Sequence, residues 1–406
     1  MSTGILTTAA LTQDLAKKSF AAYITRLMPN GQAPLFGMTS MLKTETAVQS
    51  EHGFFTKTML FPELTLSAQA AAGDTTLTVT STANILPGMM FSVYSTGENI
   101  LINSVNSATS VSVQRAVGSV AATTIASAAA LYSIGNAFEE SSLRPNALNI
   151  NPVRITNLTQ IFRNTWAISD TMRQTLMIAG DTNAAESKQD CSMFHAVDIE
   201  KALIFGQKSQ GSRNGQPFRT MDGLIAIIGN LSYYPSSYSS TNVYTAGSTT
   251  TYTQLQNYLE PCLNQTTDPK TANERIVFVG GTAKRVINDI GRLNGTYYLT
   301  DGQTNWGLQF STFKTARGTF RLIEHPVFNS NVAWAKMALV VDLATFNIAY
   351  LGDRKTQHRA FNEQAGVAQD NGIDAVGGTL TTEMTALVKN PPANAVIYNL
   401  TAGAQG

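Results

Sequence analysis

The side chains that most often bind metals or transfer protons are few in this chain and widely spaced. Its four histidines are His52, His195, His325 and His358, and its two cysteines are Cys191 and Cys262. A metal site built into a short segment groups roughly three or four such ligands, and these residues do not form that group. We therefore expect neither a metal nor a cofactor. We expect the histidines to be structural or exposed, and the cysteines to be two reduced thiols rather than a disulfide framework.

A pair of glycines marks the place where the backbone could hold a phosphate. Residues 278–285, Phe-Val-Gly-Gly-Thr-Ala-Lys-Arg, lie where a predicted strand meets a predicted helix. Free N–H groups at a helix N-terminus can bind an anion. The spacing, however, is neither that of a Walker loop nor that of a dinucleotide-binding fingerprint. We expect a tight strand-to-helix connection here rather than a phosphate site.

Arrangements that support acid–base or nucleophilic catalysis are also missing. Glu139 and Glu140 are adjacent carboxylates. On a strand they would point to opposite faces and could not act as a glycosidase pair. The chain contains no Gly-x-Ser-x-Gly nucleophile elbow. We predict that the protein is not an enzyme and has no catalytic residues.

Length and charge limit the function further. The chain has 406 residues, enough for two or three domains. Only 14% of the residues are charged and the net charge is +1, so no basic field attracts nucleic acid nonspecifically. This composition fits a protein that buries much of its surface against copies of itself, and it fits an ordinary Ala/Thr-rich bacterial protein equally well. No stretch has the pattern of a secretory signal or a membrane span, so we expect synthesis in the cytoplasm and no membrane partner.

The elements that must carry the function begin with a long ribbon. In residues 153–168, Leu158, Phe162, Trp166 and Ile168 recur at the two-residue period of a strand. This pattern predicts an extended segment with one apolar face. A short helical piece is predicted over residues 169–179.

A longer helix is predicted to follow, from Asn183 to Gly206. Asn183 is a candidate N-cap, Glu186 stands at the capping-box spacing, and Gly206 is an expected terminator. Such a helix spans about 35 Å and can act as a beam for other elements. Its side chains form two rows that mix apolar with charged residues: Cys191, Phe194, Val197, Lys201 and Ile204, flanked by Met193, Ala196, Glu200 and Leu203.

The composition changes abruptly between Leu64 and Gly135. In this stretch only Asp74, Glu98 and Arg115 are charged. Short β-rich runs recur at intervals typical of a small sandwich or barrel, at residues 77–79, 90–94, 100–105, 111–115 and 131–134. Turns are predicted at Pro87-Gly88, Thr96-Gly97 and Asn106-Ser107. The sequence therefore predicts an all-β domain inserted between two extended stretches, residues 46–62 and 138–168.

The remaining segments are predicted more coarsely. Residues 1–10 are expected to be flexible, residues 12–28 a helix, and residues 34–38 an irregular apolar strap. Beyond a glycine-rich loop at 206–220 and a surface loop at 233–252, helices and strands alternate in an α/β or α+β pattern, with helices at 253–263 and 282–290 and strands at 276–279, 319–323 and 337–341. Two extended pieces of the tail, 379–384 and 396–398, are predicted to return to the sheet beside the long helix.

The order of these elements resembles a known family. The motifs that carry the resemblance are residues 157–162, Asn-Leu-Thr-Gln-Ile-Phe; residues 168–171, Ile-Ser-Asp-Thr; residues 197–206, Val-Asp-Ile-Glu-Lys-Ala-Leu-Ile-Phe-Gly; and residues 219–224, Arg-Thr-Met-Asp-Gly-Leu. They follow one another as in major capsid proteins of tailed bacteriophages. The resemblance covers most of the chain as a pattern of elements and implies the α+β capsid fold of the Hong Kong ninety-seven type. It also implies a self-assembling icosahedral head that encloses double-stranded DNA.

The resemblance further implies a domain layout. It comprises an N-terminal arm at 1–48, an extended loop at 49–63 and 136–168, an inserted β domain at 64–135, a peripheral domain with the spine helix at 169–250 and 351–406, and an axial domain at 251–350. The N-terminal segment would pack along neighbouring subunits, although a helix docked on its own domain explains residues 12–28 equally well.

The implied partners are other copies of the chain, arranged as hexamers and pentamers in the virion. Portal, scaffolding and decoration proteins are further partners, and packaged DNA would be held without sequence-specific contacts. Some capsids of this fold crosslink a lysine to an asparagine, but no motif around Lys57 matches, so we expect a solvated lysine. Asp198, Glu200 and Lys201, with Arg163 and Arg173, could form ion pairs between subunits, but pairs within one subunit are the commoner outcome.

Two other functions are weaker hypotheses. A secreted or surface adhesin or carbohydrate-binding protein would use residues 64–135 as its binding domain. It requires a signal sequence and an aromatic platform, for which Phe91, Tyr94 and Tyr132 are the available side chains. An α/β enzyme would use residues 251–350, which lack convergent polar groups. The capsid subunit is the hypothesis that the sequence favours.

Overall fold

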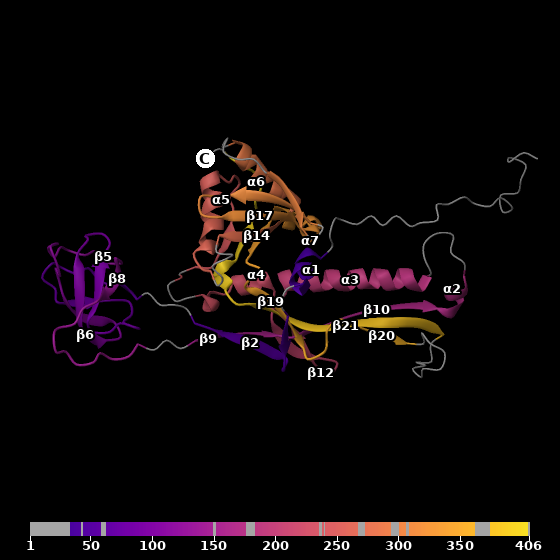
Figure 1. Cartoon of the computed structure of the whole chain (residues 1–406), viewed down its shortest axis with the longest axis horizontal. Helices are drawn as coiled ribbons and strands as arrows, with labels where there is room; N and C mark the ends of the chain where they lie inside the picture. The colour runs from indigo at the N-terminus through magenta and orange to yellow at the C-terminus, as the bar shows by residue number, and fades with distance from the viewer. Residues whose placement is uncertain are drawn as a thin grey trace, which may run out of the picture. The chain divides into compact units, whose positions relative to one another are not determined.

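A computed structural model describes residues 33–41, 44–57, 62–148, 152–175, 183–234, 238, 240–266, 273–293, 300–305, 308–361 and 374–404. The chain divides into two compact units (Figure 1). The smaller unit contains Phe55–Arg154, and the larger unit contains most of the remaining chain. The predicted segments at 1–10 and 12–28 lie outside the described residues.

The smaller unit contains a six-stranded antiparallel sheet. Its strands, in spatial order, are β3 (Glu63–Thr65), β8 (Ala130–Asn136), β5 (Met89–Val93), β6 (Asn99–Ser107), β7 (Ser110–Gln114) and β4 (Thr76–Thr78). An antiparallel bridge between Leu66 and Val79 joins the two outer strands, so the sheet closes into a small barrel. Closure leaves no free edge for uncontrolled strand pairing.

The barrel is filled by side chains that alternate along its strands. Phe91 and Val93 of β5, like Ile100 and Ile102 of β6, are buried. All five predicted strands are present, while the short strand β3 was not predicted. Gly88 and Gly97 have φ of +87° and +71°, as the predicted turns require. The predicted turn at Asn106-Ser107 is wrong, because both residues lie within β6.

The larger unit contains a seven-stranded mixed sheet. Its spatial order is β13 (Val243–Thr245), β22 (Ala395–Tyr398), β18 (Ala338–Val341), β14 (Glu274–Val279), β17 (Thr319–Glu324), β16 (Leu308–Lys314) and β15 (Thr300–Asn305). Along β14, Val277 and Val279 pack in one core with α5 (Tyr252–Leu259) and α6 (Gly281–Leu293). Phe278 points to the opposite face and joins a second core.

A five-stranded sheet lies beside this second core. Its path is β1 (Glu45–Ala47), β19 (Phe346–Leu351), β21 (Ala375–Val388) and β10 (Gln160–Ser169), and β20 (Gln357–Phe361) also pairs with β21. The long helix α3 (Asn183–Phe205) runs along β10 and β21 (Figure 1). Phe162 and Trp166 of β10 are buried, as the two-residue period predicted.

Shorter elements complete the larger unit. They are α1 (Pro34–Met41), the two-stranded pair β2 (Glu51–Thr56) and β9 (Val153–Leu158), α2 (Asp170–Gln174), the hairpin β11 (Ser209–Arg213) and β12 (Gln216–Thr220), α4 (Leu224–Ile228) and α7 (Pro326–Asn329). Two of them, β2 and β9, span the boundary between the units. The hairpin occupies the predicted glycine-rich loop, and β13 occupies part of the predicted surface loop.

Three further expectations are corrected. Residues 34–38 are helical rather than irregular, because Pro34 suits a first helical turn and Leu35 and Met38 bury one side of the helix. The strand at 395–398 pairs with β18 in the seven-stranded sheet, not beside the long helix. The other tail piece, within β21, pairs with β10 as predicted.

The third correction concerns the buried face of α3. The helix is present at the predicted residues, but its buried row is Cys191, His195, Ile199 and Leu203, at four-residue steps. Phe194, placed in the first predicted row, is 65% exposed. Because both predicted rows mixed apolar with charged residues, the periodicity could not identify the buried side.

Candidate functional site

The C-terminal end of α3 is fixed by a close backbone contact. The helix stops at Phe205, and the N–H of Gly223 donates to the carbonyl of Gly206 at 2.9 Å. A Cβ on Gly206 would lie 2.6 Å from the carbonyl oxygen of Met221. Only glycine allows this approach, so the start of α4 is held against the end of the long helix.

A buried carboxylate connects α3 to two other elements. Glu200 accepts the backbone N–H groups of Leu35 at 2.8 Å and Phe36 at 2.7 Å, in the first turn of α1. Its Oε1 lies 2.6 Å from Nε2 of His325, which precedes α7. The N–H of Val327 donates to Nδ1 of the same ring, so a neutral imidazole carries its proton on Nε2 and donates it to Glu200. Every polar atom of this cluster has a partner.

His195 lies between α3 and the five-stranded sheet. Its Nδ1 is 2.7 Å from Oδ1 of Asn164, and its Nε2 is 2.7 Å from Oγ1 of Thr382. Burial lowers the pKa of His195, and the charge of nearby Asp198 opposes this only partly. The ring is therefore a neutral hydrogen-bonding bridge between helix and sheet.

The other two histidines contact neighbouring side chains, and both cysteines are buried. His358 accepts from Nε1 of Trp166 at 3.1 Å and stacks on its ring, and His52 lies 3.6 Å from Glu45. Both cysteines are buried, and Cys191 lies one helical turn before His195. Within the described parts of the chain, no three His, Cys, Asp or Glu side chains are grouped closely enough to hold a metal ion.

The glycine pair at 280–281 is a tight connection. A Cβ on Gly280 would collide with the backbone of Ala335. The N–H of Gly281, the first residue of α6, already donates to Oδ1 of Asn329 at 2.7 Å. The geometry of this turn therefore supports packing rather than phosphate binding.

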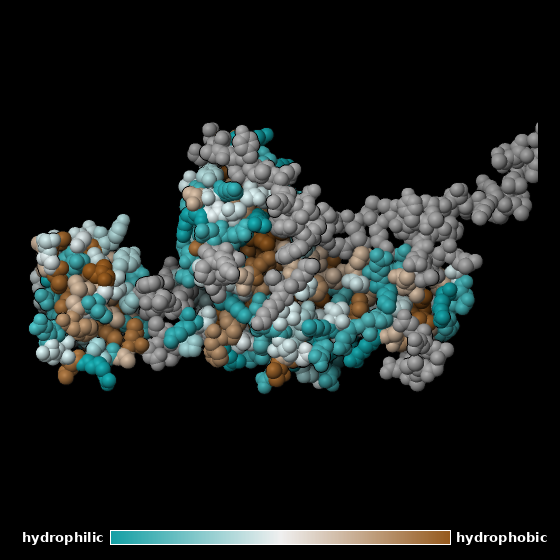
Figure 2. Space-filling view, in the orientation of Figure 1, coloured by the Kyte–Doolittle hydropathy of each residue, from teal (hydrophilic) through white to brown (hydrophobic). Residues whose placement is uncertain are grey.

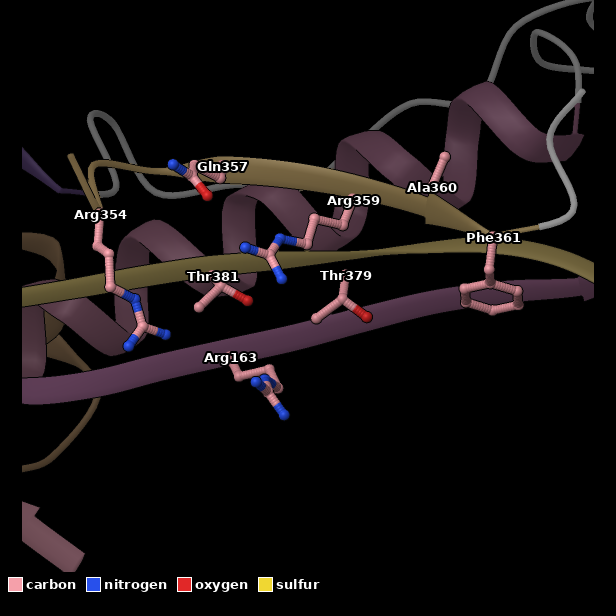
Figure 3. A pocket seen from close by; sticks show the side chains of 8 residues that line it. All are labelled: Arg163, Arg354, Gln357, Arg359, Ala360, Phe361, Thr379 and Thr381. Carbon is pink, nitrogen blue, oxygen red and sulfur yellow. The ribbon is translucent and has the colours of Figure 1, made fainter. Parts of the chain in front are cut away.

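The face of the five-stranded sheet opposite α3 carries a polar groove (Figure 3). Its lining comes from β10, β20, β21 and the turn before β20: Arg163, Arg354, Gln357, Arg359, Ala360, Phe361, Thr379 and Thr381. Three guanidinium groups and two threonine hydroxyls offer hydrogen-bond donors. This groove can bind oxyanions such as carboxylates.

The barrel carries almost no surface charge. Glu98 and Arg115 form a bidentate pair inside it, and their side chains are 0% and 6% exposed. Asp74 is the remaining charged residue between 64 and 135, a stretch that the structure describes completely. Large apolar or aromatic side chains stay exposed instead, including Tyr94 at 87% and Ile134 at 52%. Figure 2 shows the resulting mixture of brown, white and teal over this unit.

The charged residues predicted for ion pairs divide into several roles. Asp198 accepts from Asn164, and Arg173 lies 3.6 Å from Asp170, both within one chain. Lys201 and Lys57 are exposed, Glu200 is buried, and Arg163 lines the groove. Sequence reasoning missed His325, which pairs with Glu200, and it missed Arg354 and Arg359, which line the groove with Arg163. Only Glu200 gave a usable signal, because a charge among Ile199, Leu203 and Ile204 needs a buried partner.

The family model of the SU10 major capsid protein matches residues 3–401. The major capsid protein of Pseudomonas phage PaMx41 is 36% identical over 405 residues, which cover 98% of this chain and 96% of that protein. The chain belongs to the SU10 major capsid protein family. It is a phage major capsid protein, located in the virion, as the resemblance implied.

Solved structures give weaker similarities. A chain from Mycobacterium phage Adephagia has a TM-score of 0.47 at 7% identity, with 98% of each chain covered. A chain from Mycobacterium phage Bobi has a TM-score of 0.46 at 10% identity, with 95% and 96% covered. The capsid of an empty GTA particle has a TM-score of 0.47 at 10% identity, with 98% and 100% covered.

The family match also decides between the hypotheses. It spans both units rather than the barrel alone, so the adhesin or carbohydrate-binding alternative is not favoured. None of the described helices is long and apolar enough to cross a membrane.

Proposed function

We propose that copies of this chain form hexamers and pentamers and that these close into the icosahedral head around the double-stranded DNA of a tailed phage. The observation that carries the proposal is the exposure of large apolar side chains in the segments assigned to the extended loop and on the long helix. Phe55 is 69% exposed, Phe194 65% and Leu143 92%. Apolar surface of this kind marks contacts between proteins, and many such contacts add up in a closed shell.

In the proposed shell, each part of the chain forms one of the domains implied by the resemblance. Residues 1–48 act as the arm, 49–63 and 136–168 as the extended loop, and 64–135 as the inserted domain. The five-stranded sheet with α3 supplies the peripheral domain, and the seven-stranded sheet with α5 and α6 supplies the axial domain near the symmetry axes. The strands β13 and β22 extend the axial sheet beyond residues 251–350.

Further partners follow from the closed shell. Portal and scaffolding proteins would contact the subunits during assembly, and decoration proteins would contact the finished surface. DNA would be enclosed without sequence-specific contacts. A net charge of +1 over 406 residues also gives only a weak field for its phosphates. Synthesis takes place in the host bacterial cytoplasm.

The size of the purified, recombinant protein tests the proposal. Light scattering followed by negative-stain microscopy should show closed shells or rings of five and six subunits. A compact monomer or dimer that persists at high concentration, and also after co-expression with the other head proteins of the phage, would contradict it.

A further inference from the structure

The arginine groove is built by the strand register of the five-stranded sheet. Arg163 of β10 stands opposite Thr381 of β21, which stands opposite Gln357 of β20. Thr379 and Arg359 form the next pair on the same face, because side chains alternate along a strand. Figure 3 shows these side chains along the three strands.

The groove has an excess of positive charge. Arg354 donates to Glu383 at 2.5 Å, and Arg219 lies 3.9 Å from the same carboxylate, which is 1% exposed. Glu383 is therefore already paired with Arg354 and Arg219. Among the described residues, no carboxylate lies within ion-pair distance of Arg163 or Arg359, and both arginines are exposed.

The spacing of the two free arginines favours a partner with more than one acidic group. β10 and β20 lie on either side of β21, about 10 Å apart at the usual strand separation. Each guanidinium can therefore receive a carboxylate of its own. Arginine binds carboxylates through two parallel N–H groups, so a pair of neighbouring acids would fix the register of the partner.

One segment of the chain has the complementary properties. Residues 137–148 form no helix or strand, and every one of them is exposed. Glu139 and Glu140 flank the start of a turn there, and neither has an ion-pair partner among the described residues. Phe138 at 44%, Leu143 at 92% and Leu148 at 42% add exposed apolar surface. Such a segment is suited to be covered by another protein surface.

We propose that the arginine groove of one copy binds Glu139 and Glu140 of a second copy. This contact rests on the proposed shell, and it identifies the residues that select the partner and its register. Nucleic-acid phosphate is the other polyanion that arginines bind. Two free arginines on a chain of net charge +1 would release few counterions from DNA, however. The two exposed acids, in contrast, belong to the same chain, so every copy supplies one acid for each arginine.

Charge reversal tests the contact in assembly. Arg163→Glu with Arg359→Glu places like charges together and should lower the yield of particles by about 100-fold. Glu139→Arg with Glu140→Arg should do the same. The fourfold variant that carries both pairs should recover the yield to within about threefold of wild type. Arg213→Glu with Arg285→Glu, two exposed arginines outside the groove, gives the same charge change and should leave the yield unchanged. Thermal unfolding of unassembled protein checks that every variant folds.

Co-expression of the two double variants tests whether the contact joins different copies. Each variant then meets a matching partner only in another chain, so particles should return in part. Recovery in the fourfold variant without recovery in the mixture would place the contact inside one chain and overturn the proposal. Normal assembly of both double variants would overturn it as well. If the Arg163→Glu, Arg359→Glu variant assembles normally but loses DNA binding, the groove belongs to nucleic acid.

A peptide-binding measurement tests this contact independently of shell formation. A labelled peptide of residues 137–148 should bind the unassembled full chain, and the two groove substitutions should weaken binding by about 100-fold. The matched control peptide carries Gln at positions 139 and 140 and should bind as weakly. Equal binding to wild type and groove variant overturns the proposal even when shells form. Groove-dependent binding by a protein that never forms shells supports the contact and contradicts the proposed shell.

Discussion

Oε1 of Glu200 lies 2.6 Å from Nε2 of His325, and both side chains are 0% exposed. The same carboxylate receives two N–H groups from the first turn of α1, where the helix dipole favours negative charge. One buried residue thus joins α1, the long helix and the turn before α7.

Glu200→Gln should lower the free energy of unfolding by about 3 kcal/mol, because the amide cannot replace the carboxylate toward three donors. Urea unfolding of the unassembled protein measures this. Hydrogen exchange of a peptide covering residues 33–41 should speed up in the variant, since α1 loses its anchor. Lys201→Gln, at the next and exposed position of the same helix, is the control and should stay within about 0.5 kcal/mol of wild type. Equal stability of the two variants would contradict the anchor role.

His195 should make the protein less stable in mild acid. Burial lowers the pKa of its imidazole below the ordinary value of 6.5, so the unfolded chain binds the proton more readily than the folded one. Stability from this group is therefore fully present above pH 6.5 and is lost as pH falls through the lowered pKa. The difference in unfolding free energy between wild type and His195→Gln should shrink over that window. A difference that is constant with pH would show that the ring does not titrate there.

The Glu98–Arg115 pair should stabilise the barrel at neutral pH, and this stabilisation should begin to be lost at a lower pH than that of His195. Burial raises the pKa of Glu98, but hydrogen bonds from Arg115 and the Ala116 N–H outweigh it, so the pKa lies below its ordinary value of 4.5. The stabilisation is present above pH 4.5 and is lost as pH falls through the lowered pKa.

Hydrogen exchange of peptides from residues 62–136 measures the barrel within the whole chain. Glu98→Gln should increase exchange strongly at pH 7, because it leaves the buried charge of Arg115 without its carboxylate, and less at pH 3. Asp74→Asn changes the exposed carboxylate of the same unit and serves as the control. An effect of Glu98→Gln that is as large at pH 3 as at pH 7 would contradict the charge argument.

Phe194 should matter for assembly but not for folding. Its side chain is 65% exposed on α3, so Phe194→Ser should change the free energy of unfolding by less than about 0.5 kcal/mol. The yield of particles should fall, because the proposed shell covers this ring. Leu203→Ser is the contrasting variant, since Leu203 is 0% exposed and its loss should destabilise the chain itself. Full assembly of Phe194→Ser would show that this face of α3 makes no contact that assembly needs.

Local patterns predicted the elements that repeat on their own period. The strand period of Phe162 and Trp166 predicted β10 and its apolar face, although the predicted ribbon is two strands, because Leu158 ends β9. The spacing of short β runs predicted the barrel strands. The C-terminal end of α3 was predicted because Gly206 has the backbone freedom that favours a helix terminus, while the capping role of Asn183 and Glu186 stays a prediction. The order of elements was enough to recognise the capsid family.

The contacts that give these elements their function depended on the tertiary structure. Glu200 meets His325, and Arg163 shares a groove with Arg359, although each pair is far apart in the sequence. The strand β22 joined the seven-stranded sheet, and Phe194 stayed outside the core. A residue pattern specifies which side of an element is apolar, but not which partner that side meets. Strand pairing and buried charge are selected by the whole packed chain, so only the folded structure could decide them.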